Sequence, residues 1–192
     1  MEHRDIKPVA WARSKRDSYG IRLLFFVVLG GTGRLSDHIR RQTDMNIAIG
    51  SDHAGYRLKE EIKSFIEAMG HHVMDVGCHC EDSVDYPDYA LPVCQKVTTG
   101  EAERGILICG TGIGMSMAAN KTKGIRCALA HDTFSAKATR EHNDANVLAL
   151  GERIIGPGLA QDIVKLFLET PFSGADRHQK RVDKVEALEK EN

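Results

Sequence analysis

The sequence predicts an α/β fold of the doubly wound, Rossmann-like type: a five-stranded parallel sheet with helices on both faces, in three layers. Three observations support this prediction. From residue 45 onward, short apolar runs alternate with stretches of helical periodicity. Several runs, such as 105–109, are apolar at nearly every position, which is typical of parallel strands buried on both faces. Polar or glycine-rich residues follow these runs, as expected where strands pass into helices.

The elements follow one another along the chain in alternating order. The run at 46–50 predicts the first strand, and apolar residues then recur at helical spacing from Leu58 to Met69. The further strands are expected at 72–76, 105–109, 125–130 and 146–150, and the helices at 54–69, 86–99, 114–121, 133–142 and 157–169. A last helix near 177–191 carries a narrow apolar stripe of Val182, Val185 and Leu188. We expect this C-terminal helix to pack on the domain or at a dimer interface.

Residues 1–44 differ from the rest and are predicted to be an N-terminal extension to a domain at 45–192. They contain nine Lys and Arg against five Asp and Glu, without a sustained period. The apolar run at 23–29 leads into Gly30-Gly31-Thr32-Gly33, which resembles a phosphate loop, but no helical period follows it. The arginines would suit a targeting segment, whereas the acidic residues count against one. A poorly ordered leader is the simplest expectation.

The composition argues against several classes of function. The chain has 26 Lys and Arg against 27 Asp and Glu, so it lacks the basic excess of a nucleic-acid-binding or membrane-binding surface. Its longest apolar run has seven residues, whereas a membrane-spanning helix needs roughly 20. Five cysteines, an odd number, and the absence of a signal-peptide pattern favour free thiols in a reducing, cytoplasmic setting.

Chemically active residues follow the predicted strands at their carboxyl ends. Asp52 and His53 follow the first strand, Cys109 ends the third, and 131–132 (His-Asp) and 152–153 (Glu-Arg) follow the fourth and fifth. Open parallel sheets bind ligands at this edge, where the N-termini of helices also point. We therefore expect these groups to gather at one edge of the sheet.

The most informative segment is Cys109-Gly110-Thr111-Gly112-Ile113-Gly114. Its three glycines let the backbone approach a ligand closely, and free N–H groups at the start of a helix favour an anion. The dinucleotide pattern G-x-G-x-x-G is absent because Met115 stands where its last glycine would fall, so no such cofactor is expected. A thiol beside a helix N-terminus can act as a base or nucleophile, although a buried core thiol is the alternative for Cys109.

Other candidates are open to two interpretations. Arg177 and Arg181 would share a helical face and can grip a phosphate, or they form a solvated basic face. His142 closes a predicted helix, where it can cap the helix or donate a proton to a sugar ring oxygen. The clusters at 71–72 (His-His) and 78–80 (Cys-His-Cys) lack zinc-like spacing, so no metal is expected.

Residues 45–192 resemble ribose-5-phosphate isomerase B and its relatives, the allose-6-phosphate and galactose-6-phosphate isomerases. Separate motifs carry this resemblance in the order found in the family. They are Gly50-Ser51-Asp52-His53-Ala54-Gly55, Asp85-Tyr86-Pro87, Ile108-Cys109-Gly110-Thr111-Gly112-Ile113-Gly114, the stretch 142–151 (HNDANVLALG) with Arg153, and Arg177-His178-Gln179-Lys180-Arg181-Val182. Residues 1–44 have no counterpart in it.

The resemblance implies a role for each matching residue. It implies that Cys109 is the base, that His142 acts as an acid in ring opening, that Thr111 stabilises an enediolate, and that Asp52 assists ring opening or contacts the substrate. The implied substrate contacts are His53, Tyr86, Gly110, Gly112, Ile113, Gly114, Asn143, Arg153, Arg177 and Arg181. The resemblance further implies a site between two subunits, and so a homodimer or a dimer of dimers.

The implied activity is the interconversion of ribose 5-phosphate and ribulose 5-phosphate through a cis-enediolate, a step of the pentose phosphate pathway. This chemistry moves a proton and needs neither a redox cofactor nor a metal. An allose-6-phosphate or galactose-6-phosphate isomerase remains an alternative, as does a non-catalytic sugar-phosphate-binding module. A thiol redox protein is disfavoured because the sequence lacks a C-x-x-C motif.

Overall fold

The computed structural model describes residues 44–190, and the expectations for the extension at 1–44 therefore lie almost wholly outside the described residues. The strands are β1 (Asn46–Ser51), β2 (His72–Asp75), β3 (Arg104–Cys109), β4 (Cys127–Leu129) and β5 (Val147–Gly151). The helices are α2 (Tyr56–Ala68), α3 (Tyr86–Thr98), α4 (Ile113–Ala119), α5 (Thr133–Asn143), α6 (Pro157–Glu169) and α7 (Asp176–Ala187). Two 3₁₀ turns, His53–Gly55 and Leu188–Lys190, complete the described elements.

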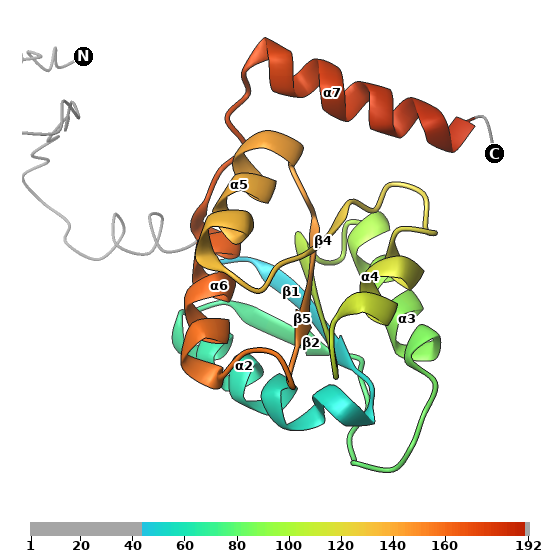
Figure 1. Cartoon of the computed structure of the whole chain (residues 1–192), viewed down its shortest axis with the longest axis vertical. Coiled ribbons are helices and arrows are strands. Elements are labelled where there is room, and N and C mark those ends of the chain that lie inside the picture. Colours follow the sequence, from blue (N-terminus) through green and yellow to red (C-terminus); the bar gives the residue numbers. More distant parts are fainter. Residues whose placement is uncertain (1–43, 191–192) are drawn as a thin grey trace, which may run out of the picture. The chain divides into compact units, whose positions relative to one another are not determined.

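All five strands are parallel and lie in the order β2-β1-β3-β5-β4. Figure 1 shows the sheet between two helical layers, with α2, α5 and α6 on one face and α3 and α4 on the other. This arrangement confirms the predicted fold class. The chain winds from β1 to one side and from β3 to the other, so the crevice for a ligand is expected between the carboxyl ends of β1 and β3.

Alternating side chains of the strands build two separate cores. Ile106 and Ile108 of β3 pack with residues of α2, α5 and α6, whereas Leu107 and Cys109 pack with residues of α3 and α4. Successive residues of a strand point to opposite faces, which explains why strands of this sheet are apolar at nearly every position. The same alternation turns the Cys109 side chain toward the start of α4.

The structure shortens two of the predicted elements. The fourth strand pairs only over Cys127–Leu129 instead of 125–130, because β4 is an edge strand and the backbone N–H of Arg126 donates to the side chain of Asn146 (2.8 Å) instead of a ladder partner. The first predicted helix begins as the 3₁₀ turn, whose N-terminus is capped by Asp52. The helix expected at 114–121 also has different bounds, since α4 covers Ile113–Ala119.

The helix α7 lies at the amino end of the sheet, beyond the end of α5 (Figure 1). Val182 is buried, but Val185 and Leu188 are 52% and 57% exposed. Within a single chain, only the first residue of the predicted apolar stripe is therefore buried. Among residues 44–190, no helix is long and apolar enough to cross a membrane.

Candidate active site

Cys109 ends β3, and its thiol faces the turn that opens α4. The backbone N–H of Gly112 donates to Sγ of Cys109 (3.0 Å), and the thiol is 6% exposed. Gly112 has φ 75°, a conformation that costs other residues energy, and a Cβ at this position would also collide with the backbone of Leu150. We call residues 110–114 the anion turn, because its N–H groups gather at the N-terminus of α4.

Thr111 is an exposed polar residue of the anion turn. Its hydroxyl oxygen accepts a weak hydrogen bond from the backbone N–H of Ile113 (3.4 Å). The hydroxyl hydrogen is not used in that bond, so Thr111 can donate to a bound oxygen. The turn therefore offers a side-chain donor beside its backbone donors.

Asp52 and His53 follow β1 at the same edge. Asp52 is 7% exposed, and its carboxylate accepts the backbone N–H of Ala54 (2.9 Å). Burial raises the pKa of Asp52 above its ordinary value, although this hydrogen bond and the charges of His53 and Arg153 oppose the shift. Nδ1 of His53 accepts the backbone N–H of Val84 (3.2 Å), so the neutral ring carries its proton on Nε2.

Two glycines of the anion turn make room for side chains from other elements. A Cβ on Gly110 would lie 3.4 Å from Nε of Arg153, and one on Gly114 would lie 2.9 Å from the ring of Tyr86. Arg153 follows β5 and Tyr86 begins α3. The structure thus brings Tyr86 and Arg153 against the turn that follows Cys109.

Two carboxylates at this end of the sheet accept hydrogen bonds from backbone N–H groups near the starts of helices. Glu152 accepts the backbone N–H of Leu58 (2.9 Å) near the start of α2, and Asp132 accepts that of Ser135 (2.7 Å) at the start of α5. His131, which follows β4, has a buried Nε2 without a partner among residues 44–190. These groups therefore follow the carboxyl ends of the strands, as expected, and Glu152 and Asp132 hold the starts of helices there.

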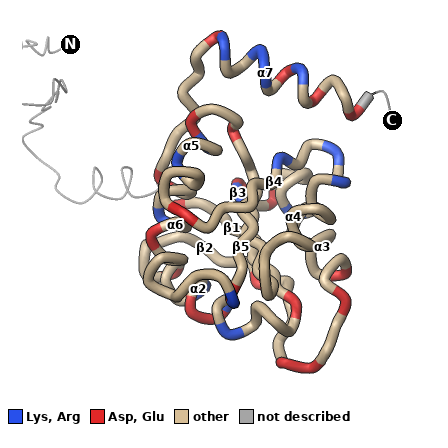
Figure 2. The backbone as a smooth tube through the Cα atoms, viewed as in Figure 1, with Lys and Arg blue, Asp and Glu red and all other residues tan. Residues whose placement is uncertain are grey.

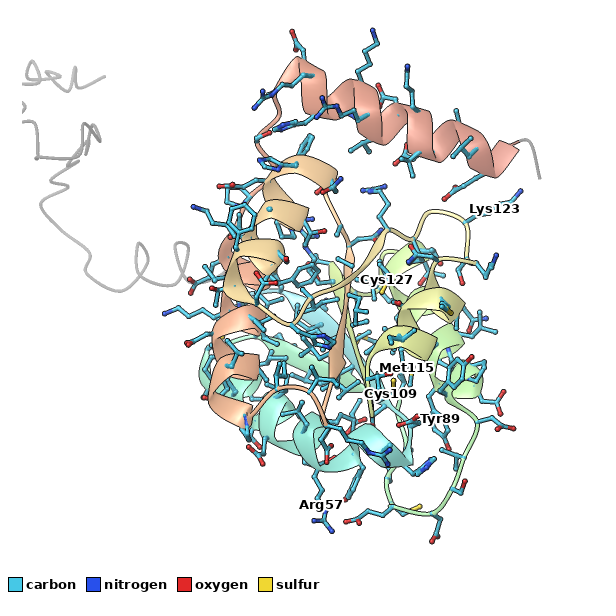
Figure 3. All side chains as sticks on the ribbon, viewed as in Figure 1. Arg57, Tyr89, Cys109, Met115, Lys123 and Cys127 are labelled. Atoms are coloured by element: carbon cyan, nitrogen blue, oxygen red, sulfur yellow. The ribbon has the colours of Figure 1, made fainter. Side chains whose placement is uncertain are left out.

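Four of the predicted site residues lie at the opposite end of the sheet, where its strands begin. They are His142, Asn143, Arg177 and Arg181. The helix α5 starts beyond the carboxyl end of β4 and returns, so His142 and Asn143, at its end, lie near the start of β5. Four residue steps separate Val147, which starts β5, from Gly151, the partner of Cys109, and they span about 13 Å. Figure 3 shows Cys109 at one end of the sheet and Lys123 toward α7 at the other.

The residues at the amino edge form a group of their own. The rings of His142 and His178 pack with centroids 4.5 Å apart, and Nδ1 of His178 lies 2.7 Å from Oγ of Ser173. Asn143 and Arg181 line a groove of about 500 Å³ beneath α7. Figure 2 shows basic residues along α7 and in the loop between α4 and β4, at this end of the domain. The contacts of His178 and Ser173 had no signal in the sequence.

The histidine and cysteine clusters of the loops have other partners. Nδ1 of His71 accepts the backbone N–H of Met45 (3.3 Å), and the thiol of Cys78 donates to the carbonyl of Cys80 (2.6 Å). Within the described part of the chain, no group of three or more His, Cys, Asp or Glu side chains could hold a metal ion.

Fold and site together define a doubly wound α/β protein with a thiol beside a glycine-rich turn at the carboxyl end of its sheet. The sequence model of a family described as Ribose/Galactose Isomerase matches residues 47–185. The chain belongs to this family. The comparison confirms the predicted resemblance and the class of the sugar phosphate isomerases.

The matches to individual relatives cover nearly the whole length of each relative. A Bacillus subtilis protein named as a proposed sugar phosphate isomerase is 61% identical over 149 residues, which are 77% of this chain and 99% of that protein. Ribose-5-phosphate isomerase B of Escherichia coli is 46% identical over 143 residues, 74% of this chain and 95% of that protein. The structure of ribose-5-phosphate isomerase B from Clostridium thermocellum has 53% identity and a TM-score of 0.75, and the match covers 77% and 99% of the two chains.

Proposed function

We propose that this chain interconverts ribose 5-phosphate and ribulose 5-phosphate, with Cys109 as the base that moves the proton. The observation that carries the proposal is the hydrogen bond from the Gly112 N–H to Sγ of Cys109 (3.0 Å) within the anion turn. This contact places the sulfur beside the backbone donors of the turn, and a cysteine sulfur in its thiolate form can accept a proton. The turn stands at the edge where doubly wound sheets bind ligands.

The proton transfer follows from this arrangement. The thiolate of Cys109 removes the proton from C2 of the open aldose, the C–H electron pair forms a C1–C2 double bond, and the carbonyl oxygen becomes an enediolate oxygen. The thiol then returns the proton to C1 while the proton of the C2 hydroxyl passes to the oxygen on C1. The anion turn and Thr111 donate to the charged oxygen, and the loss of one such donor typically costs about 3–4 kcal/mol.

Ring opening must precede this step, because ribose 5-phosphate is mostly a closed ring. In our proposal His142 donates a proton to the ring oxygen as the bond from C1 breaks, and Asp52 accepts the proton of the C1 hydroxyl. The raised pKa of Asp52, caused first by burial, makes its carboxylate a better base than an exposed one. His53, Tyr86, Asn143 and Arg153 contact the sugar phosphate in this proposal.

The two groups of residues then require two copies of the chain. Cys109 and His142 lie at opposite edges of one sheet, so we propose that the His142 edge of one subunit completes the Cys109 edge of the other. Arg177 and Arg181 would bind the phosphate across this interface. Ile113 and Met117, on α4, are 46% and 63% exposed, which leaves an apolar surface beside the anion turn for a partner. The assembly is a homodimer or a dimer of such dimers.

A six-carbon sugar phosphate is the second candidate substrate, because the family's description includes galactose as well as ribose. Turnover of ribose 5-phosphate, allose 6-phosphate and galactose 6-phosphate by the full chain decides between them. We expect ribose 5-phosphate to have a kcat/KM at least about tenfold above the others, since one extra carbon unit changes binding by about 1–3 kcal/mol. A preference for a six-carbon substrate would contradict the proposal, and binding without turnover would indicate a non-catalytic module.

A further inference from the structure

His142 rests on a buried ring that the proposed mechanism does not use. Its partner, His178, comes from the first turn of α7 and is 5% exposed, whereas the side chain of His142 is exposed. The two rings lie 4.5 Å apart at an interplanar angle of 49°. The position of the His142 ring therefore depends on that of His178.

Ser173 fixes the His178 ring and ties it to α5. Its hydroxyl lies 2.7 Å from Nδ1 of His178, and its backbone N–H donates to the carbonyl of Glu141 (3.1 Å), the residue before His142. The same hydroxyl accepts a weak hydrogen bond from the N–H of Ala175 (3.4 Å). Ser173 thus connects the end of α5 with the start of α7 beside the contact between the two histidine rings.

The surroundings of His178 disfavour the protonated form of its ring. Desolvation lowers the pKa of His178, and the positive charges of Arg177, His142 and Arg181 lower it further, against a smaller opposing effect of the Glu141 carbonyl. His178 is therefore uncharged at neutral pH.

We propose that His178, held by Ser173, is a positioning residue for ring opening: it fixes the ring of His142 so that its proton points at the sugar ring oxygen. This inference rests on the proposed function, because it acts through His142. It concerns only the opening of the ring and not the proton transfer by Cys109.

The two directions of the reaction separate these steps. Ribose 5-phosphate must open its furanose ring before isomerisation. Ribulose 5-phosphate cannot form a five-membered ring, because the hydroxyl that would close it, on C5, carries the phosphate. Exchange of the C1 proton of ribulose 5-phosphate with deuterated water therefore reports proton abstraction alone.

The test compares Ser173→Ala and His178→Phe with the wild-type chain in both assays. We expect kcat with ribose 5-phosphate to fall about tenfold or more, since misplacement of a catalytic group by about 1 Å can cost up to about a hundredfold. Exchange from ribulose 5-phosphate stays within about twofold of wild type. Ser173→Thr, which keeps the hydroxyl, restores turnover of ribose 5-phosphate, and Ser64→Ala, a matched substitution on the exposed face of α2, changes neither rate.

An equal fall of both rates would show a merely structural role and overturn the inference, as would unchanged turnover of ribose 5-phosphate in both variants. Failure of the proposed function has a different signature. In that case the wild-type chain itself catalyses neither turnover nor exchange, before any variant is compared.

Discussion

The Cys109 thiol and the Asp52 carboxyl group lie at the carboxyl ends of neighbouring strands, and each accepts a hydrogen bond from a backbone N–H. Cys109 receives the N–H of Gly112, and Asp52 receives that of Ala54. The sequence predicted this half of the site because strand ends and a glycine-rich turn are visible as patterns. It could not predict that Glu152 and Asp132 cap helices, since a carboxylate after a strand looks the same in either role.

Asp52 carries a cost in stability that its proposed role explains. Burial raises its pKa, so the folded state binds the proton more tightly than the unfolded chain, and ionisation above the folded-state pKa opposes folding. We expect Asp52→Asn to raise the melting temperature at pH 7 and to lose this advantage as the pH falls below that pKa. The same variant should lower turnover about a hundredfold or more. Thermal unfolding at several pH values, with a parallel activity assay, measures both effects.

A melting temperature of Asp52→Asn that stays below the wild type at every pH would contradict this assignment. Unchanged turnover would remove Asp52 from ring opening and leave it as a cap of the 3₁₀ turn.

At the scale of the element, the direction of α5 decides which residues can meet. A helix that follows a parallel strand returns to the amino edge of the sheet, so a residue at its end cannot join a site at the carboxyl edge of the same chain. The pattern of alternating strands and helices already contained this conclusion for His142. The extent of β4 was less predictable, because Ile125 and Ala130 are buried like strand residues without extending the strand.

A buried ion pair joins α2 to β2. Nζ of Lys59 is fully buried and lies 2.8 Å from the carboxylate of Asp75, whose side chain is 9% exposed. Burial by itself would raise the pKa of Asp75, but the hydrogen bonds from Lys59 and the Gly77 N–H hold it below its ordinary value. Because the folded state releases this proton more easily, the pair stabilises the fold above the unfolded pKa of about 3.9 and loses this contribution as the pH falls through the folded-state pKa.

Lys59→Met is expected to lower the free energy of unfolding by about 3–5 kcal/mol near pH 7, because it removes the buried partner of the Asp75 carboxylate and leaves only Lys63 and the Gly77 N–H beside it. Lys63→Met is the matched control: Lys63 is 32% exposed and 3.3 Å from the same carboxylate, and its loss should cost at most about 1 kcal/mol. Urea titrations at pH 7 measure both variants. Equal losses in the free energy of unfolding would show that the burial of Lys59 does not make its ion pair stronger than that of Lys63.

For the molecule as a whole, the proposed function implies that one chain presents two half-sites at opposite ends of its sheet. In the proposed dimer, a second copy would cover the exposed apolar residues of α4 and the apolar stripe of α7. Neither periodicity nor composition identifies which surfaces meet, because an interface has no sequence period of its own. The proposed dimer is therefore tested by function across subunits.

Subunit complementation provides this test. Cys109→Ala and Arg181→Ala are each expected to be nearly inactive. Mixed dimers, co-expressed with two different tags and purified through both, contain one site with both residues intact, so they should regain about half of the wild-type activity. Mixed dimers as inactive as their parents would show that Cys109 and Arg181 do not form a site across the interface.

Turnover of ribose 5-phosphate in deuterated water, followed by proton NMR, tests whether Cys109 moves the proton. The wild-type chain should form ribulose 5-phosphate with deuterium taken up from the solvent. Cys109→Ala should keep its fold by circular dichroism and lose at least about a hundredfold in rate, as expected for removal of a general base. Cys80→Ala, which removes an exposed thiol, should match the wild type. A Cys109→Ala chain that still turns over ribose 5-phosphate within about tenfold of the wild-type rate would show that Cys109 is not the base.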